Sequence, residues 1–352
     1  MIGIRALAQH LDISIGTVSR ALNGKADVNA ETRRRVLEAA AELGYSPNQS
    51  GRSLRHGTTN LVGVLIPANR KKSLIDFTFA EALNGVREAL QGKGLDLAIF
   101  LCAEEEDSFA ALRRVAERRL ADGLIIADTL RSDPRIDYLL ERAIPFVAFG
   151  RSRSGGGHPW VDIDFPGAVK QAIALLAEAG HQRIGMVLSA SEFNFIRLMR
   201  ETFRRELKSR GLDTDAELLV CSGHGANSGY DGASQLLALA EPPTAMLTQN
   251  GDLAVGLYRR LGEAALRPGH DIAVLSMEDD GRAHFLSPSL CSFRADLSEV
   301  GARLGAALLS ALAAKEAVEP VEALMPMVYR PGESSGWSGP AQGKASPRTR
   351  KP

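Results

Sequence analysis

A short stretch near the N-terminus carries the residue types that nucleic-acid recognition uses. Its members are small or polar, with one arginine, and they follow a serine that can cap a helix. Arginine pairs bidentately with guanine, and serine or threonine hydroxyls bind phosphates or base edges. The pattern indicates a helix that enters the major groove of DNA, and the residues concerned are Ser14, Ile15, Gly16, Thr17, Ser19 and Arg20.

Chemistry of other kinds finds little support in the sequence. There is no GxxxxGK[ST] phosphate loop, no GxSxG nucleophile elbow and no HExxH helix. The glycine-rich run Ser222-Gly223-His224-Gly225 is interpreted as a plain loop. Cys102, Cys221 and Cys291 lie far apart in no metal-ligand or redox spacing, which argues against zinc and disulfides. We therefore expect no enzyme, no cofactor, no metal and a reducing compartment.

Three short amphipathic segments are expected to position the DNA-facing residues: Ile4–Leu11, Ile15–Leu22 and Ala30–Leu43. Their spacing fits a helix-turn-helix, in which the N-terminal residues of the second helix enter the groove. An ordinary helical bundle has the same pattern, so the helices alone leave both interpretations open. The residues expected to pack are Leu7, Ala8 and Leu11 against Val18 and Leu22, with Val36, Leu37, Ala40 and Leu43 in the third helix.

The charge of the whole chain gives no sign of nucleic-acid binding, because 42 basic residues balance 42 acidic ones. Residues 1–56 carry eight basic residues against five acidic ones, a modest local excess. No apolar run approaches the roughly 20 residues of a membrane span. The polar N-terminus is also unlike a signal peptide. We expect a soluble, cytoplasmic protein that does not bind a membrane.

From residue 60 onward, short apolar runs alternate with longer segments of helical period, which is typical of an α/β fold with parallel sheets. The expected strands are Leu61–Ile66, Leu95–Leu101, Gly123–Ile126, Phe146–Phe149, Arg183–Leu188, Glu217–Cys221, Ala245–Leu247 and Ile272–Leu275. The expected helices include Ala80–Leu90, Ala110–Leu120, Pro166–Ala179 and Leu253–Leu261. Residues 151–159 are expected to form neither strand nor helix and to divide this region into two lobes around a cleft.

The domain boundaries follow from these patterns. We expect a helical domain at 1–47, a linker at 48–59 and a two-lobed α/β region at 60–332. Residues 333–352 are rich in Gly, Ser, Pro, Lys and Arg and are expected to be a disordered tail.

Several motifs together resemble the LacI/GalR family of transcription regulators. The resemblance lies in residues 14–24 (SIGTVSRALNG), 28–33 (VNAETR) and 43–48 (LGYSPN), and it continues in 123–126, 144–147, 179–184 and 243–246. It implies a repressor that binds a pseudo-palindromic double-stranded operator as a homodimer through a DNA-binding domain at 1–47. Residues 48–59 would form a hinge helix and linker, and residues 60–332 would be an effector-binding and dimerisation domain. Its first lobe would hold about 60–151 and 285–318, and its second about 159–284 and 319–331. The resemblance also implies that the core resembles periplasmic sugar-binding proteins, with two Rossmann-like lobes that bind a small-molecule effector, expected to be a sugar.

The resemblance assigns roles to the DNA-facing residues. Ile15 and Gly16 would discriminate between operators, and Arg20 would contact a base. Residues 48–55 would become a helix only on DNA, with Leu54 inserted into the minor groove. Gly51 departs from the family's usual alanine and costs about 0.5–1 kcal/mol of helix stability. Phosphate contacts are expected from Thr17, Ser19, Asn23, Asn29 and Thr32. Ser14, Asn48 and Arg52 are further candidates for contact with DNA.

The effector contacts implied by the resemblance come from several loops. Carbohydrates need planar polar groups for paired hydroxyls and an aromatic face for the apolar side of the sugar. The candidates are Asp76, Phe77, Phe79, Trp160, Asp164, Phe193, Arg197, Asn250, Asp252 and Glu278, and each aromatic alone is also a candidate for core packing. The chain departs from the family at Met199, Gly251 and Met277, so we expect an effector other than the family's commonest one.

Two alternatives stay open at this point. The effector could be a purine or nucleotide-like molecule, or the chain could be a sugar-binding receptor that does not act on DNA. The sequence leaves open whether the protein is a dimer or a tetramer, since the region after Glu333 has no heptad repeat that would support a coiled-coil tetramer.

Overall fold

The computed structural model describes residues 3–22, 24–25, 27–45, 58–66, 77–102, 106–278, 281, 285–314 and 319–336. Two compact units separate along the chain, one formed by Met1–Thr59 and one by Asn60–Pro352. The expected hinge helix at 48–55, with Asn48, Arg52 and Leu54, lies outside the described residues, as does Asn23.

The described residues of the first unit form the helices α1 (Ile4–Leu11), α2 (Ile15–Leu22) and α3 (Ala30–Glu42). Leu7, Val18 and Val36 are completely buried at their centre, and Leu11 and Leu22 pack at its margin, so the expected contacts of the first two helices are confirmed. The prediction of Leu37 in this core is wrong, since its side chain is 50% exposed. Successive residues of a helix point about 100° apart, so Leu37 turns away from the stripe that Val36, Ala39 and Ala40 form.

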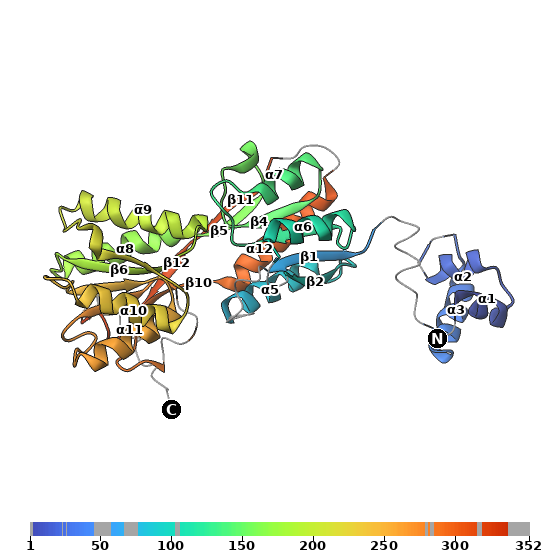
Figure 1. Ribbon diagram of the computed structural model, residues 1–352. Helices are drawn as coiled ribbons and strands as arrows, with labels where there is room; N and C mark the ends of the chain where they lie inside the picture. Colours follow the sequence, from blue (N-terminus) through green and yellow to red (C-terminus); the bar gives the residue numbers. More distant parts are fainter. Residues whose placement is uncertain are drawn as a thin grey trace, which may run out of the picture. The chain divides into compact units, whose positions relative to one another are not determined.

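The described residues of the second unit form two six-stranded sheets, each flanked by helices (Figure 1). The first sheet has the strand order β11-β5-β4-β3-β1-β2 and is parallel throughout. The second has the order β12-β10-β9-β8-β6-β7, in which β12 runs antiparallel to β10 and the other pairs are parallel. The expected α/β architecture of two lobes is therefore confirmed.

The strands are β1 (Leu61–Ile66), β2 (Asp96–Leu101), β3 (Gly123–Ile126), β4 (Phe146–Phe149), β5 (Trp160–Ile163), β6 (Ile184–Ser189), β7 (Leu219–Ser222), β8 (Ala245–Thr248), β9 (Ala273–Ser276), β10 (Cys291–Ala295), β11 (Glu322–Met325) and β12 (Met327–Arg330). The helices are α5 (Phe77–Leu90), α6 (Ser108–Glu117), α7 (Pro134–Glu141), α8 (Phe165–Glu178), α9 (Asn194–Ser209), α10 (Ala226–Leu237), α11 (Gly251–Glu263) and α12 (Leu297–Ala313). All eight expected strands are present, although the first residues expected in β7 belong instead to a 3-10 turn at Ala216–Leu218.

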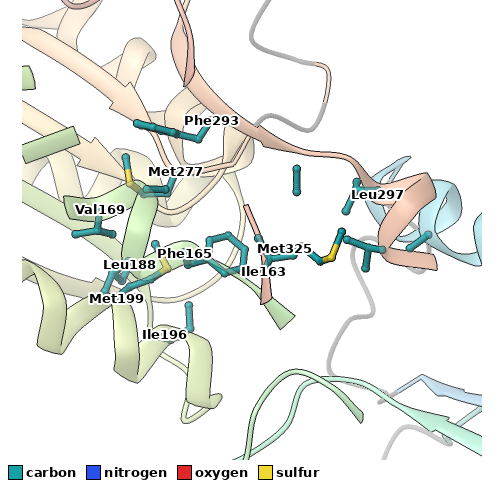
Figure 2. Packing of buried hydrophobic residues seen from close by; sticks show 14 of the residues in the cluster. Ile163, Phe165, Val169, Leu188, Ile196, Met199, Met277, Phe293, Leu297 and Met325 are labelled. Atoms are coloured by element: carbon teal, nitrogen blue, oxygen red, sulfur yellow. The ribbon is translucent and has the colours of Figure 1, made fainter. Parts of the chain in front are cut away.

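Within the described ranges, the chain passes between the lobes three times, and these positions correct the expected lobe boundaries. The first passage follows β5, the second follows β10, and the third separates β11 from β12. Residues 160–163 and 322–325 therefore belong to the first lobe, and residues 291–295 belong to the second. Apolar side chains continue across the passages, where Ile163, Met325 and Leu297 lie near Phe165 (Figure 2).

The segment 151–159 does not separate the lobes as predicted, because it belongs to the first one. Ser154–Gly156 forms a 3-10 turn, and the Ser154 hydroxyl accepts a hydrogen bond from the Asp133 amide at 2.7 Å. His158 is buried and stacks on Phe146, with ring centroids 6.0 Å apart. Glycines at positive φ, such as Gly155 at +69°, let the segment fold back onto α7. The composition of residues 151–159 predicts a linker, but Gly, Ser and Pro are common in packed turns as well. Composition alone therefore does not distinguish a linker from a packed turn.

The start of the expected disordered tail is packed against the second lobe. Ser334 is completely buried, and its hydroxyl accepts a hydrogen bond from the Cys291 amide at 2.8 Å while donating to the Val274 carbonyl at 2.6 Å. Ser335 is also buried. The tail prediction is therefore wrong for residues 333–336, and residues 337–352 lie outside the described part of the chain.

Each lobe contains a close helix crossing without intervening side chains. In the first lobe, a Cβ on Gly301 of α12 would lie 1.9 Å from the Ala82 carbonyl oxygen of α5. In the second, a Cβ on Gly256 of α11 would lie 1.7 Å from the Ala226 carbonyl oxygen of α10. Both distances are far below van der Waals contact with backbone atoms, so these positions require glycine.

We predict that Gly256→Ala destabilises the core by about 1–3 kcal/mol, because α10 and α11 must separate to admit a methyl group. Gly262→Ala on the same helix is the matched control, since a Cβ on Gly262 would have no described neighbour within 4 Å. This control is expected to be neutral or to stabilise by about 0.5–1 kcal/mol. Denaturant unfolding followed by circular dichroism measures both, and equal stabilities would contradict the close crossing.

Candidate functional site

A cleft of about 240 Å³ lies where the carboxyl ends of the parallel strands of both lobes meet. Open α/β sheets bind ligands at this edge, because the loops that follow the strands converge there. The first lobe contributes Phe79, Ala127, Asp128, Thr129, Phe149, Gly150, Asp162, Ile163 and Leu297. The second contributes Phe165, Ser189, Phe193, Phe195, His224, Gly225, Gln249, Asn250, Asp252 and Glu278.

Five of the residues expected to contact an effector are brought together in this lining. Asn250, Asp252 and Glu278 follow β8 and β9, and Phe79 and Phe193 come from the two opposite lobes. The Asn250 side chain also caps α11, since its Oδ1 accepts a hydrogen bond from the Leu253 amide at 3.1 Å. That bond fixes the orientation of the Asn250 amide at the cleft.

Three other expected residues lie outside the lining and have other partners. Trp160 packs against the apolar cluster of the first lobe, with the Arg151 guanidinium 5.7 Å from its ring centroid. Asp164 caps α8 through the Gly167 amide at 3.0 Å. Arg197 donates to Asn194 Oδ1 from Nε at 3.1 Å and from Nη2 at 2.9 Å. Asp76 and the side chain of Phe77 lie outside the described residues.

Several lining residues are absent from the candidates that the sequence suggests. Thr129, Ser189 and Gln249 each lie at or just after the end of a strand, and His224 belongs to the run interpreted as a plain loop. Their common signal is position at the carboxyl end of a strand rather than residue type. Gln249 Oε1 accepts a hydrogen bond from the Ser189 amide at 2.9 Å, which ties two of these ends together.

The aromatic part of the lining lies mostly on the second lobe. Phe165 and Phe195 have ring centroids 5.3 Å apart, and Phe193 and Phe195 are stacked at 6.1 Å with 22° between their planes. Phe149 of the first lobe also lines the cleft. Together these rings provide an apolar wall, whereas the acids and amides provide hydrogen-bonding groups.

Asp162 is the most buried acid of the described lining, at 4% exposure. Burial raises the pKa of its carboxyl, and the Arg151 guanidinium, whose Nε donates to Asp162 Oδ2 at 2.6 Å, partly offsets this rise. The Ile163 amide donates to the other oxygen at 2.9 Å. These bonds hold the carboxylate at one orientation beside the cleft.

A buried ion pair braces the wall formed by residues 127–129. Arg135 and Asp133 are 3% and 0% exposed, with Arg135 Nη2 2.7 Å from Asp133 Oδ2. The same Nη2 donates to the carbonyls of Ala127 and Asp128 at 3.1 and 3.0 Å. These bonds hold Asp128 at φ +55°, a left-handed conformation that is unfavourable for a non-glycine residue.

The pair is also an electrostatic brace. Burial alone would raise the pKa of Asp133, but hydrogen bonds and charge from Arg135, with the Leu130 amide, lower it below its usual value. A lowered carboxyl pKa stabilises the fold above the unfolded pKa of about 3.9. This contribution is lost as the pH falls through the lower folded value.

The lobes also make direct hydrogen bonds beside the cleft, through Asn194 at the start of α9. The backbone amide of Asn194 donates to the Thr129 carbonyl at 2.8 Å, and its side-chain Nδ2 donates to the Arg151 carbonyl at 2.7 Å. Arg197 therefore orients the Asn194 side chain, which in turn joins the second lobe to the first. This gives Arg197 a positioning role in the structure.

The outer face of α2 in the first unit is the second candidate site. Ile15, Gly16 and Arg20 are exposed, and Thr17 and Ser19 are half-buried beside the buried Val18. The Ser14 hydroxyl accepts the Thr17 amide at 3.0 Å and so caps the helix. The expected face is therefore present as a solvent-exposed edge.

Two expected phosphate-binding residues occupy the start of α3. Asn29 caps this helix, with Oδ1 accepting the Thr32 amide at 2.7 Å. The N-terminal amides of a helix favour anions, because their dipoles align and their hydrogens lack partners within the helix. Asn29 and Thr32 thus lie at a helix N-terminus, a position that favours a bound anion.

Neither a metal centre nor a membrane span is found in the described ranges. Among the described residues, no group of three or more His, Cys, Asp or Glu side chains is arranged to hold a metal ion. No helix in the described part of the chain is long and apolar enough to cross a membrane.

Comparison with family models and known proteins adds to this geometry. Residues 4–48 match the model of bacterial regulatory proteins of the lacI family, and residues 173–335 match a periplasmic binding protein-like domain. The HTH-type transcriptional regulator AglR of Rhizobium meliloti (strain 1021) is 34% identical over 315 residues, which cover 88% of each chain. RafR of Escherichia coli is 35% identical over 70% of this chain and 72% of its own.

Solved structures are similar along almost the whole chain. A complex of the transcriptional regulator CelR with cellobiose has a TM-score of 0.72 and 25% identity, covering 95% of this chain and all of its own. The lac repressor dimer bound to operator and the anti-inducer ONPF has a TM-score of 0.81 over 95% of this chain and 98% of its own. At 23% identity, this second likeness concerns the fold alone.

We predict that Arg135→Met lowers the free energy of unfolding by about 3–5 kcal/mol, because it leaves the Asp133 carboxylate buried without its partner. The fall in stability between neutral and acid pH should also shrink, since the lowered Asp133 pKa depends on Arg135. Arg113→Met is the matched control, because Arg113 forms an exposed pair with Glu117. Denaturant unfolding at pH 7 and at about pH 3, below the unfolded carboxyl pKa, measures both variants. Similar midpoints for the two variants would refute the brace.

Proposed function

This chain belongs to the LacI family of bacterial regulatory proteins, and from that premise we propose that it is a repressor whose operator affinity is set by an uncharged sugar bound in the cleft. It is a DNA-binding transcription regulator, as its relatives are. The repressor sense, the effector class and the residue roles are our proposals.

One observation carries the DNA-binding proposal: the α2 face is exposed while the opposite face is fully buried. Ile15 is 39% exposed, whereas Val18 is completely buried and Ala21 nearly so. Ile15 is not part of the apolar cluster that the described residues of this unit form, and the next residue, Gly16, has the Arg20 guanidinium close to it. Contact with the major groove gives these side chains a role, and Arg20 has the reach and donors to bind a guanine.

The effector proposal depends on the chemistry of the cleft lining. Its described ionisable side chains are His224 and four acids, Asp128, Asp162, Asp252 and Glu278, and no lysine or arginine is among them. Carboxylates accept hydrogen bonds from sugar hydroxyls, and at close range they repel phosphate or uronate groups. The Phe193–Phe195 stack suits the apolar face of a pyranose. A relative of this fold was solved with cellobiose, which supports the same class.

Regulation then follows from thermodynamic linkage. A ligand that contacts both lobes favours one lobe arrangement, and an effector that lowers operator affinity must itself bind more weakly to the DNA complex. A homodimer on a pseudo-palindromic operator is the proposed assembly, supported by the lac repressor dimer of the same fold. We further infer that the protein acts in the cytoplasm, where bacterial DNA is, and performs no catalysis.

We predict that Arg20→Ala weakens operator binding by about 1–3 kcal/mol and relaxes preference at one base pair of each half-site. The probe is a duplex that the wild-type protein selects from a randomised library, compared with an unrelated duplex of equal length. Arg34→Ala is the control, because Arg34 is exposed in the same unit but pairs with Glu31 and Glu38 on α3. Unchanged sequence selection by Arg20→Ala would refute the docking proposal.

The effector class is tested by isothermal titration with cellobiose, ribose, glucose 6-phosphate, glucuronate and hypoxanthine. We expect saturable binding of a neutral sugar and none of the anionic ones. Phe193→Ala should weaken that binding about two- to tenfold through lost stacking, whereas Phe285→Ala, 88% exposed and outside the lining, should not. Tighter binding of a sugar phosphate or of the purine would overturn the proposed class.

A further inference from the structure

We propose that Asp27 is a positioning residue for Arg20 that increases discrimination between DNA sequences. This inference rests on the proposed contact of Arg20 with a base. It concerns an exposed ion pair at the edge of the DNA-facing helix, where Arg20 Nε lies 3.3 Å from Asp27 Oδ2. Both side chains are accessible, at 50% and 61% exposure, so DNA can reach the pair directly.

The Arg20 side chain lies back along its own helix. Side chains of an α-helix tilt towards its N-terminus, which places residue 20 above residue 16 one turn earlier. A Cβ on Gly16 would lie 3.6 Å from Arg20 Nη1 and 3.9 Å from Nη2. The guanidinium therefore occupies space over Gly16 that a larger side chain would need.

Asp27 is placed beside the guanidinium by the turn between α2 and α3. Gly24, at φ +67°, follows α2, and the Lys25 amide donates to the Arg20 carbonyl at 3.1 Å. The Val28 amide then donates to the Lys25 carbonyl at 3.3 Å, and the Val28 side chain is buried. These bonds fix the turn on both sides of Asp27, so its position is set by the fold.

The Lys25 carbonyl is held from a second direction as well. Arg33 of α3 donates to it from Nη2 at 2.6 Å. The Lys25 backbone is thus hydrogen-bonded to both α2 and α3. These bonds constrain the backbone near Asp27 and keep its side chain beside Arg20.

Two physical effects follow from the pair. A guanidinium already held in one orientation loses less rotamer freedom when it binds a base edge. A carboxylate beside it also disfavours the approach of phosphates, which are the contacts that bind all sequences alike. Both effects lower affinity for unrelated DNA relative to the operator.

The test compares Asp27→Asn with the wild type as full-length protein, using the library-selected duplex and the unrelated duplex at several salt concentrations. Asparagine keeps the size of the side chain but removes its charge. We expect tighter binding to the unrelated duplex and a specific-to-nonspecific ratio that falls about two- to fivefold, the size of an exposed ion pair. Thermal unfolding of each variant verifies that the unit stays folded.

A selection profile adds a readout that general charge or stability would not alter. Asp27→Asn should relax preference at the same base pair that Arg20→Ala relaxes, and it should have no further effect in the Arg20→Ala background. Asp27→Glu keeps a carboxylate at this position, so it should retain part of the base preference that Asp27→Asn loses.

Glu38→Gln is the matched control, since it also removes one carboxylate from this unit but pairs with Arg34. It should leave the base preference unchanged. If Arg20→Ala relaxes selection but Asp27→Asn does not, the positioning role is refuted while the proposed function stands. If Arg20→Ala itself has no effect, the proposed base contact fails first.

Discussion

The structure of the core depends on the three described passages of the chain between its lobes. Asp164 and Asp296 stand at two of them, and each caps the helix that follows, through the Gly167 and Glu299 amides. A continuous apolar cluster surrounds the passages (Figure 2). Because the passages are packed and two of them are capped, relative movement of the lobes is confined to a few backbone torsions at the ends of these elements. The lining of the cleft includes residues at two of them, Ile163 and Phe165 at the first and Leu297 at the second.

Two ion pairs with opposite properties serve the two candidate sites. Arg135 and Asp133 are buried, so their separation is unfavourable, and they hold one wall of the cleft in a single conformation. Arg20 and Asp27 are exposed, so solvent screens them and DNA can reach the pair directly. A rigid wall suits a site that must recognise a small molecule, whereas an accessible pair suits a surface that contacts DNA.

Much of this architecture could be predicted from the sequence, because apolar periodicity reports local burial. The helices 4–11 and 15–22 and the runs 61–66 and 123–126 have that signal. Strand β5 contains Asp162, and β11 and β12 are half-exposed edge strands around Pro326, so none forms an apolar run. Which sheet a strand joins depends on pairing across long sequence distances, and no local pattern reports it. Gln249 and Thr129 escape prediction for a related reason, since their place in the cleft follows from topology.

The edge strands have a consequence for how the protein is made on the ribosome. Glu322–Met325 completes the first sheet, and Met327–Arg330 with the buried Ser334 completes the second. Neither sheet has all its described strands until residues 322–330 have been synthesised, whereas the N-terminal unit, with its own buried core, emerges first. During translation, newly made protein therefore passes through a stage with a finished DNA-facing module and an unfinished sensor. Truncation before residue 322 removes one edge strand from each sheet.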